Sequence, residues 1–543
     1  IDAAVEKIGA VPTLNDVLLP AMKEVGDKFG AGELILPFVL QSAEVMKRAV
    51  SRLERYLDKL AGYTKGTVVL ATVFGDVHDI GKSLVNTILT NNGYTVVDLG
   101  KQVPISTILE AAVEHDATAI GLSALLVSTS KQMPAAVQEL HQRELPFPVL
   151  IGGAAINRNF GLRIIYPHGA DSDAVYEPGV FYCKDAFEGL AKMDQLIDPE
   201  ARAALVSRTR GAAQTLRDQP PEVDDDAPPV TDASVRSTAA TDNPVPEPPY
   251  WGVRELPVSL DEVYRHLDTH VLFKLHWGGR GVKGDAWARL LREAFQPRLE
   301  RMWAEQDYLQ PRALLGYFPC NSEGNELIVW DPQDFDPAHP RELERLVFPR
   351  QPRHDRICLA DFYREYDPTH PEPDVVALQA VTSGDRVTPL IASLEHDGEF
   401  AEQLFVHGLG VQTAEGMAEW LHATVRAQLA IAPTQGRRWS WGYPACPEQS
   451  ELEKVFRLLD ARSIGLRLSG GFAVEPEQST LAIVAHHPQA VYFGIRSGTL
   501  PRTARQAADE LIAGTDRDPT RSAALPDADP AGALEDEPAL AEA

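Results

Sequence analysis

Basic side chains are scarce in this sequence. Its 543 residues contain 51 lysines and arginines against 78 aspartates and glutamates, which gives a formal net charge of −27. A protein binds nucleic acid largely by neutralising phosphates with lysine and arginine, so this balance argues against a nucleic-acid partner.

Cysteines are also few, and they show no metal-binding spacing. The four are Cys183, Cys320, Cys358 and Cys446. Their scatter gives no support to a disulfide scaffold or a zinc module and suits a reducing cytoplasm, where we expect the chain to be. No signal peptide and no apolar run long enough to span a membrane is visible, so we expect no membrane partner.

The most informative motif is Gly-Asp-Val-His-Asp-Ile-Gly at 75–81, directly after an apolar run at 67–74. The run predicts a buried strand, and the apolar spacing over 82–92 predicts a helix after the motif. His78 therefore lies in a strand-to-helix loop, where an imidazole can face a large cofactor or bind a metal. Taken alone, the motif is also compatible with an ordinary solvated loop histidine.

Further strands and helices alternate after this loop. We predict strands at 95–99, 119–125 and 148–151, and helices at 105–114 and 133–143. The alternation predicts a parallel sheet with helices on both faces, which binds ligands at the carboxyl ends of its strands. Hydroxyl groups follow the third strand at Ser123, Ser128 and Thr129. Gly152 and Gly153 end the fourth strand, where the lack of side chains lets a bulky ligand approach the backbone.

These motifs closely resemble the cobalamin-binding domain of cobalamin-dependent methionine synthase. The matching stretches are Gly-Asp-Val-His-Asp-Ile-Gly-Lys at 75–82, Gly-Leu-Ser-Ala-Leu at 121–125 and Ile-Gly-Gly-Ala at 151–154. The resemblance implies that His78 is the lower axial ligand of cobalt in a base-off cofactor. It also implies that Asp76 and Thr129 lie behind the imidazole, where a carboxylate fixes the tautomer and raises the basicity of the ligand.

The same resemblance implies a wider set of cobalamin contacts. The implied cobalamin-binding residues are Gly75, Asp76, Val77, His78, Asp79, Ser123, Val127, Gly152, Gly153 and Ala186. The small residues Ser123, Gly152 and Gly153 would line the slot for the nucleotide tail of the cofactor. Val127 departs from the pattern, because some members of the family have threonine near the tail.

Residues 1–62 are predicted to form a helical bundle that acts as a cap. Apolar residues recur there at three- and four-residue spacing, from Leu14 to Leu57. The loop at 26–37 resembles the family's cap over the upper face of methylcobalamin, which implies that Phe29 and Leu36 shield the methyl group. Without the resemblance, both residues would be interpreted as ordinary core residues.

Two segments are predicted to be disordered, a linker at 212–249 and an acidic tail at 516–543. Both are rich in Pro, Asp and Ala and poor in large apolar residues, so they cannot bury enough surface to offset ordering entropy. The linker separates an α/β cobalamin domain at 63–211 from a second folded region at 250–515.

The second folded region has mixed patterning, which predicts an α+β fold. We predict helices at 260–267, 287–305, 414–429 and 451–460, and strands at 326–330, 356–359, 481–485 and 490–495. Its distinctive stretch is Arg-Trp-Ser-Trp-Gly-Tyr-Pro-Ala-Cys-Pro at 438–447, a stiff loop next to an arginine that suits a carboxylate. Alone, this is a weak signal for a carboxylate ligand or a structural turn.

This stretch resembles the S-adenosylmethionine-dependent activation domain of the same family. The implied S-adenosylmethionine-binding residues are Asp268, Glu415, Arg438, Tyr443, Ala445, Tyr492 and Phe493. Arg438 would hold the methionine carboxylate. Glu415 and Asp268 would lie near the ammonium and sulfonium groups, where negative charge is favourable. Cys446 has no base beside it in sequence, and we interpret it as structural.

We therefore expect a multidomain chain: a helical bundle cap, a flavodoxin-like (Rossmann-like) parallel-sheet cobalamin domain and an α+β activation domain. The resemblance implies methyl transfer from methyltetrahydrofolate to homocysteine through cobalamin, and reactivation with S-adenosylmethionine and an electron donor such as flavodoxin. The chain starts at Ile1 without a methionine. We expect a monomeric fragment, preceded by homocysteine and folate modules that contain the zinc site.

Two alternatives remain at this stage. The first half could be a corrinoid methyl carrier for another methyltransferase, or a cobalamin-based light sensor. A sensor would add a DNA-binding helix pair or a kinase, and the Gly-Tyr-Pro stretch at 442–444 argues against both. The other alternative is a protein that only binds or stores the cofactor.

Overall fold

The structure is a computed structural model of the chain. It describes residues 1–30, 34–53, 56, 64–125, 127–153, 156–169, 174–218, 236–333, 336, 340–352, 355–369, 372–443 and 445–494. The predicted tail at 516–543 lies outside these residues. Within the described part, no helix is both long and apolar enough to cross a membrane.

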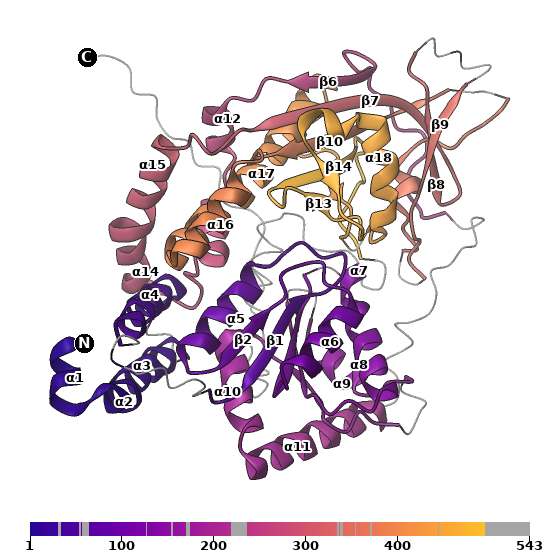
Figure 1. Cartoon of the computed structure of the whole chain (residues 1–543). Helices are drawn as coiled ribbons and strands as arrows, with labels where there is room; N and C mark the ends of the chain where they lie inside the picture. The colour runs from indigo at the N-terminus through magenta and orange to yellow at the C-terminus, as the bar shows by residue number, and fades with distance from the viewer. Residues whose placement is uncertain are drawn as a thin grey trace, which may run out of the picture.

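A five-stranded parallel sheet forms the centre of the first half of the chain (Figure 1). Its strands are β1 (Thr67–Thr72), β2 (Thr95–Asp98), β3 (Ala119–Ser123), β4 (Val149–Gly152) and β5 (Val180–Tyr182). Their order is β2-β1-β3-β4-β5, with parallel pairing throughout. This is the flavodoxin-like order, whose switch point between β1 and β3 is the usual ligand position.

Helices cover both faces of this sheet, as the alternation predicted. They are α5 (Ile80–Asn91), α6 (Ile105–Glu114), α7 (Val127–Ser130), α8 (Gln132–Gln142), α9 (Arg158–Ile164), α10 (Ala186–Leu196) and α11 (Pro199–Asp218). The alternating side chains of β1 divide between two cores. Val69 and Ala71 pack with α6 and α8, whereas Val68 and Leu70 pack with α5 and α10. Strands with apolar side chains on both faces are typical of such a three-layer domain.

The N-terminal residues form the predicted helical cap. Its helices are α1 (Asp2–Ile8), α2 (Ala10–Pro12), a π-helical turn (Thr13–Leu18), α3 (Leu19–Gly30) and α4 (Leu36–Leu53). Helices α3 and α4 pack through Met22, Ala43 and Met46. One member of the predicted apolar stripe, Val45, is 68% exposed, because it lies on the outer side of α4.

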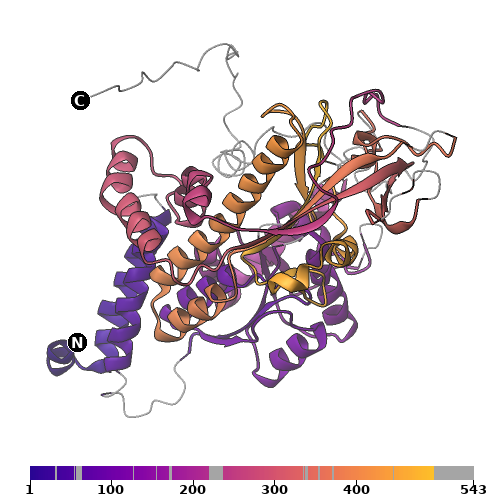
Figure 2. The same ribbon diagram turned by 90° about the horizontal axis from the view of Figure 1, so that it is seen from above.

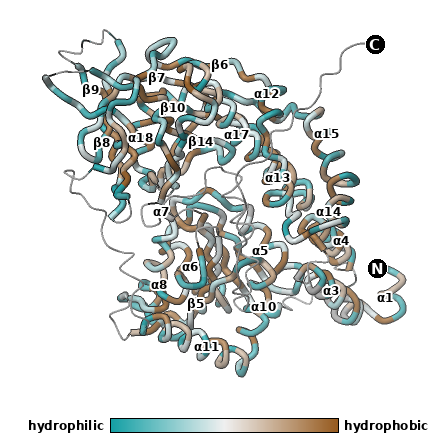
Figure 3. The backbone as a smooth tube through the Cα atoms, turned by 180° about the vertical axis from the view of Figure 1, so that it is seen from behind, coloured by the Kyte–Doolittle hydropathy of each residue, from teal (hydrophilic) through white to brown (hydrophobic). Residues whose placement is uncertain are grey.

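The second half of the chain contains an antiparallel sheet of order β11-β14-β10-β7-β8-β9, with β6 paired to β7. The strands are β6 (Gly252–Leu256), β7 (Arg312–Glu323), β8 (Glu326–Trp330), β9 (Glu342–Val347), β10 (Asp374–Thr382), β11 (Arg437–Ser440) and β14 (Ser479–Ala485). A short pair, β12 (Arg467–Leu468) and β13 (Val474–Glu475), lies beside it. Figure 3 shows the hydrophobic segments gathered along the strands, as a buried sheet requires.

Helices pack on both faces of the antiparallel sheet. They are α12 (Leu260–Arg265), α13 (Thr269–Val271), α14 (Gly284–Leu290), α15 (Gln296–Ala304), α16 (Val387–Asp397), α17 (Phe400–Gln428) and α18 (Leu452–Leu459). Two π-helical turns (Leu272–His276 and Leu291–Phe295) and three 3-10 turns (Leu359–Phe362, Gln449–Glu451 and Ala461–Ile464) complete the helical segments. Alternate residues of β10 join the core under α17 and the core under α18, so this strand lies between two layers.

Several predicted elements differ from the observed ones. The strand predicted at 356–359 is absent: the segment leads into a 3-10 turn whose Asp361 carboxylate accepts from the Cys358 amide at 3.1 Å. The strand predicted at 490–495 is a single bridge residue, Phe493, over its described part. The helix predicted from residue 414 begins at Phe400. Gly408 lies so close to Trp277 that a Cβ there would clash, so this glycine is a packing residue and not a helix end.

The linker is also shorter than predicted. Its first residues, up to Asp218, continue helix α11, and residues 219–235 lie outside the described part. At its other end, Arg236 donates to the carbonyl oxygens of Asp361 and Tyr363, at 3.3 and 3.2 Å. Arg236 therefore ties the end of the linker to the second sheet domain.

The antiparallel domain lies over the carboxyl edge of the parallel sheet, whereas the cap lies to one side (Figures 1 and 2). Helix α4 contacts both α5 and α17. This arrangement decides which side chains meet at the loop that contains His78.

Candidate functional site

The His78 loop follows β1 at the switch point of the parallel sheet. It turns at Gly75, whose φ of +83° favours glycine over any residue with a side chain. Asp79 then becomes the N-cap residue of α5. The predicted motif residues are therefore held between a strand end and a helix start, and Val77 is buried beneath them.

The Asp76 carboxylate is fully buried and anchors the loop. One oxygen, Oδ1, lies 2.7 Å from Nδ1 of His78 and accepts from the His78 amide at 3.1 Å. The other, Oδ2, accepts from the Thr129 hydroxyl at 2.6 Å and from the Leu125 amide at 2.8 Å. The structure thus brings together the predicted set of His78, Asp76 and Thr129.

These contacts shift the ionisation of the two groups in opposite directions. Burial alone raises the pKa of Asp76, but the hydrogen bonds from His78 and Thr129 outweigh it and lower the pKa to about 2. Burial lowers the pKa of His78, yet the Asp76 hydrogen bond and the charge of Glu477 raise it above its usual value. Burial raises the pKa of Asp79, the third ionisable residue of the loop. Asp76 is therefore an anion that fixes the imidazole proton on Nδ1.

The other ring nitrogen of His78, Nε2, has no hydrogen-bond partner among the described residues. The side chain is 22% exposed, so the ring is not sealed in the core. An imidazole whose Nδ1–H is held by a carboxylate is the usual form of a metal-binding histidine. The residues present therefore fit a cobalt ligand at His78.

The ends of β3 and β4 complete this edge. Ser123 and Gly152 are the last paired residues of their strands. A Cβ on Gly153 would lie 1.9 Å from the Ala124 carbonyl oxygen, so only glycine fits between these two strand ends. The strand ends at which the slot is predicted thus have small residues, and the slot itself stays a prediction. The prediction for the Val127 side chain lies outside the described residues.

Three predicted cobalamin contacts lie elsewhere in this arrangement. The Phe29 ring packs on Phe187, with ring centroids 4.9 Å apart. Ala186 is buried with Val39 of the cap. Leu36 lies against Gly278 of the antiparallel domain. None of these contacts is to the His78 loop, because the cap lies beside α5 and α10.

A loop of the antiparallel domain lies against the His78 loop. Gly471 lies against Gly75, so closely that a Cβ on Gly471 would be 2.3 Å from the Gly75 Cα. The Ser469 hydroxyl donates to the Gly75 carbonyl at 3.2 Å. Gln102 donates to Glu475 at 3.0 Å. The loop at 469–475 is therefore seated on the His78 loop.

The second predicted site forms around the buried guanidinium of Arg438, at the start of β11. Its Nη2 atom lies 2.9 Å from Glu419 and 3.3 Å from Glu415, and Nη1 donates to Ser440 at 3.4 Å. The two glutamates are one helical turn apart on α17, so they share one face. Burial lowers the pKa of Arg438, but these two charges outweigh it and keep the side chain cationic.

The Arg438 site contains polar atoms without partners. Arg438 Nε and the indole nitrogens of Trp439 and Trp441 are buried without a hydrogen-bond partner among the described residues. A buried donor without a partner costs free energy, and a bound carboxylate would satisfy Arg438 Nε. The site thus fits a ligand that has a carboxylate next to a cationic group.

The other predicted residues of this site have different positions. The charge of Glu415 raises the pKa of Tyr443 to about 12, which indicates that the two side chains are close. The Tyr492 ring lies 6.0 Å from Trp439. Phe493 and Ala445 are buried in the main core.

Asp268 and Cys446 make structural contacts. The Asp268 carboxylate accepts from the Val271 amide at 3.0 Å and caps α13. Its neighbour Leu267 packs on Gly416, which follows Glu415. The Cys446 thiol donates to the Ser440 carbonyl at 3.0 Å.

Sequence reasoning missed Glu419. Burial raises its pKa, but its contacts with His422 and Arg438 outweigh burial and hold the pKa far below the usual value. The available signal was its position four residues after Glu415 on a predicted helix.

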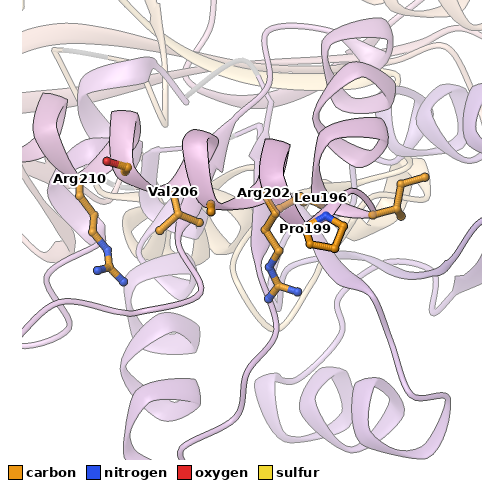
Figure 4. A pocket seen from close by; sticks show the side chains of 8 residues that line it. Leu196, Pro199, Arg202, Val206 and Arg210 are labelled. Carbon is orange, nitrogen blue, oxygen red and sulfur yellow. The ribbon is translucent and has the colours of Figure 1, made fainter.

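A surface pocket between α10 and α11 belongs to neither site (Figure 4). Arg202, Val206 and Arg210 of α11 line it, and Arg210 forms an ion pair with Glu177. It lies under the parallel sheet domain, away from the carboxyl edge (Figure 1).

Comparison with protein families agrees with this geometry. A model described as "B12 binding domain" matches residues 66–162, and a second model with the same description matches residues 1–54. A model of the activation domain of vitamin B12 dependent methionine synthase matches residues 280–500. The fold and the His78 loop thus define a B12-binding protein with an attached activation domain.

Two curated relatives support the same family. Methionine synthases of Mycobacterium leprae and Mycobacterium tuberculosis are each 36% identical to this chain over 91% of it. The chain spans 44% of the length of each. A crystal structure of the MetH reactivation domain bound to AdoHcy is 25% identical, with a TM-score of 0.42, and the match covers 50% of this chain and 90% of that one. The chain belongs to the cobalamin-dependent methionine synthase family and comprises its cap, B12-binding and activation domains.

Proposed function

We propose that this chain is the cofactor-carrying and reactivating part of a methionine synthase, which transfers a methyl group from 5-methyltetrahydrofolate to homocysteine. The observation that carries the proposal is the seating of the 469–475 loop on the His78 loop. The activation domain lies over the carboxyl edge of the parallel sheet, where the cofactor would bind. The two halves of the chain can therefore act on the same cobalt.

At the first site, bound cobalamin would supply a cobalt centre that accepts and donates the methyl group. His78 would hold the cobalt through Nε2, while Asp76 orients the ring and accepts a hydrogen bond from Nδ1. Thr129 holds the far oxygen of Asp76 in place. The raised pKa of His78 would favour a protonated imidazole whenever the ring is not bound to a metal.

At the second site, the amino-acid end of S-adenosylmethionine is the ligand that fits best. Arg438 pairs with its carboxylate through the donor that is unpartnered in the described residues. Glu415 and Glu419 supply negative charge for its ammonium group. The exposed ring of Tyr443 stands next to them and can cover the nucleoside.

The wider setting of the chain follows from the family. Homocysteine and folate modules of the same polypeptide would supply and accept the methyl group, and flavodoxin or a similar donor would supply the electron for reactivation. A monomeric state and a cytoplasmic location stay predictions from the sequence.

Absorbance spectra of the cobalamin-loaded chain, with and without S-adenosylmethionine and a reductant, test the proposal. Reactivation predicts conversion to the methylated cofactor only when both are present. A corrinoid carrier or a storage protein would bind the cofactor and show no dependence on S-adenosylmethionine. A light sensor would show a spectral change on illumination that alters binding to a partner.

A further inference from the structure

Residues 236–250, the described end of the predicted linker, form a strap along the activation domain. Ala239 packs on the core under α18, whereas Val245 and Tyr250 pack on the core under α17. Pro248 is buried as well. The strap therefore passes from one core of the antiparallel domain to the other and is folded as a part of this domain.

Arg236 anchors the first residue of the strap. Its Nη1 atom donates to the Ser322 hydroxyl at 3.0 Å, and its Nη2 atom donates to the carbonyl oxygens of Asp361 and Tyr363. The Ser237 amide donates to the Asp361 carboxylate at 3.1 Å. The Arg236 side chain is only 18% exposed, so these bonds form largely out of water, where they are stronger than on a surface.

A second anchor lies four residues further along the strap, at Ala240. Its amide donates to the Gln489 side chain at 2.8 Å, and its carbonyl oxygen lies 2.9 Å from Nε2 of His487. The other ring nitrogen of His487 accepts from the Gln489 amide at 3.1 Å. These roles define an uncharged imidazole with its proton on Nε2. The strap is thus bound to the segment after β14 as well.

Both anchors converge on the ring of Phe362. This residue follows Asp361 in the 3-10 turn at 359–362, to which the first anchor is bonded. The centroid of its ring lies 5.6 Å from that of His487, to which the second anchor is bonded. Because the strap binds beside Phe362 both along the chain and in space, the position of this ring depends on the strap.

Phe362 in turn supports the strand that contains Arg438. Its ring stacks on Trp439 of β11, with centroids 5.7 Å apart and ring planes at 12°. Successive side chains of a strand point to opposite faces, so Trp439 packs in the core under α18 while Arg438 faces α17. Trp439 also lies beside Tyr492, another predicted ligand residue. The stack of Phe362 and Trp439 therefore holds the Arg438 strand from behind.

From these contacts we propose that Arg236 is a positioning residue for the ligand at Arg438. By holding the strap on the turn at 359–362, Arg236 fixes the stack of Phe362 and Trp439 and with it the direction of the Arg438 guanidinium. No strap residue is among the predicted ligand contacts, so the action is indirect. That the ligand is S-adenosylmethionine rests on the proposed function, whereas the dependence of Trp439 on Arg236 does not.

The strap and the ligand should stabilise each other by the same factor, because coupling between two sites is reciprocal. In the full parent chain, saturating S-adenosylmethionine should slow hydrogen exchange over residues 236–240 about three- to tenfold. Arg236→Ala should speed this exchange and weaken S-adenosylmethionine binding in calorimetry about three- to tenfold. A strap that only stabilised the fold would show no response to the ligand, and its loss would leave the affinity of the folded chain unchanged.

Two further variants separate the strap from net charge. Gln489→Ala removes the acceptor of the Ala240 amide at an exposed position without changing the charge, and it should weaken S-adenosylmethionine binding about two- to fourfold. Arg345→Ala removes the same charge as Arg236→Ala and breaks ion pairs with three glutamates on β7, β8 and β9. It touches no strap contact and should leave the affinity within about twofold of the parent.

Fluorine NMR of the chain labelled with fluorotryptophan tests the stack without any ligand. Trp439→Phe identifies the Trp439 resonance by its loss. This resonance should shift in Arg236→Ala and keep its position in Arg345→Ala; if Arg236→Ala does not fold, the shift in Gln489→Ala decides instead.

The outcomes distinguish the two proposals. An unshifted Trp439 resonance, parental affinity in Arg236→Ala, or exchange over 236–240 that does not respond to bound S-adenosylmethionine overturns the role of Arg236. If S-adenosylmethionine does not bind the parent chain, the proposed function fails, and the Trp439 resonance alone decides the role of Arg236.

Discussion

The Thr129 hydroxyl donates a 2.6 Å hydrogen bond to Oδ2 of Asp76, while Oδ1 of the same carboxylate faces His78. One carboxylate therefore connects a hydroxyl on α7 with the imidazole at the end of β1. Since Oδ2 also accepts from the Leu125 amide, Asp76 has little freedom to rotate. The orientation of His78 is thus fixed from behind by the end of β3 and by α7.

Thr129→Val tests this fixation. The variant removes a hydrogen bond to the Asp76 carboxylate, so the pKa of Asp76 should rise. The more basic carboxylate should accept more strongly from the imidazole, so the pKa of His78 should rise further. We expect bound cobalamin to release His78 at a shifted pH in an absorbance titration. Thr215→Val, which removes an exposed hydroxyl bonded to the Gly211 carbonyl, is the matched control. A Thr129 variant that titrates like the parent would exclude this residue from the relay.

Asp76→Asn should make stability depend less on pH. The pKa of Asp76 in the folded state, about 2, is below the usual 3.8. Its contribution to the free energy of unfolding is therefore present above pH 3.8 and is lost as the pH falls toward 2. The raised pKa of His78 contributes stability below 6.5, and this is lost as pH rises through the folded pKa. The variant should therefore lose most free energy of unfolding near pH 5. We expect a loss of about 1.5–3 kcal/mol, the worth of a charge-assisted hydrogen bond. Urea unfolding of the cofactor-free chain at pH 5 and pH 8 measures this, and equal losses at both would contradict it.

His78→Gly should change the state of bound cobalamin. The variant removes the only described group that we assign to the lower face of the metal, so the spectrum at neutral pH should be that of a base-off, water-ligated cofactor. Added imidazole should restore the parental spectrum, because it fills the space left by the ring. A parental spectrum without imidazole would remove His78 from the metal.

Buried charge in the activation domain gives a stability prediction. Arg350 is fully buried and forms two hydrogen bonds with Asp361, at 2.6 and 2.7 Å. Asp361→Ala would leave a buried arginine without its partner, which costs about 3–5 kcal/mol. Glu255→Ala breaks a bidentate pair with Arg312 that is exposed, and should cost at most about 1 kcal/mol. Denaturant unfolding of both variants measures the difference in unfolding free energy. Similar losses in the two variants would show that the buried pair stabilises the domain no more than the exposed pair does.

The parallel sheet and the His78 loop were predictable from the sequence because their signals are local. The apolar run of β1 and the motif after it lie within 15 residues, from 67 to 81. The helix and strand order then decides that the ends of β1 and β3 meet at one edge. The Asp76–Thr129 contact follows from this topology.

The parts that could not be predicted depend on contacts between distant segments. Glu44 and Ala401 are 357 positions apart, and no pattern in either segment indicates the other. The position of the cap on the activation domain was missed for this reason. Similarly, a glycine such as Gly408 often ends a helix, yet α17 continues through it. Its close contact with Trp277, which leaves no room for a Cβ, explains the glycine and cannot be seen in the sequence.

Arg438→Ala tests the second site most directly. Its guanidinium should form paired charge-assisted hydrogen bonds with the ligand carboxylate, each worth about 1.5–3 kcal/mol. Since about 1.4 kcal/mol corresponds to tenfold in Kd, the variant should bind S-adenosylmethionine at least roughly tenfold more weakly in calorimetry. Cobalamin binding should not change, because Arg438 is on β11 and makes no described contact with the His78 loop. Reactivation should fail at modest S-adenosylmethionine and partly recover at saturating levels.

The adjacent Arg437 provides the control for this experiment. Its guanidinium donates to the carbonyl oxygens of Thr434 and Gly436, at 2.8 and 2.6 Å, and so supports the turn before β11. Arg437→Ala removes the same charge from the chain and should leave the affinity for S-adenosylmethionine within about twofold of the parent. If both variants lose affinity equally, the effect comes from net charge or from the strand. If neither loses affinity, the ligand does not bind at Arg438, and the buried cluster with Glu415 and Glu419 is structural.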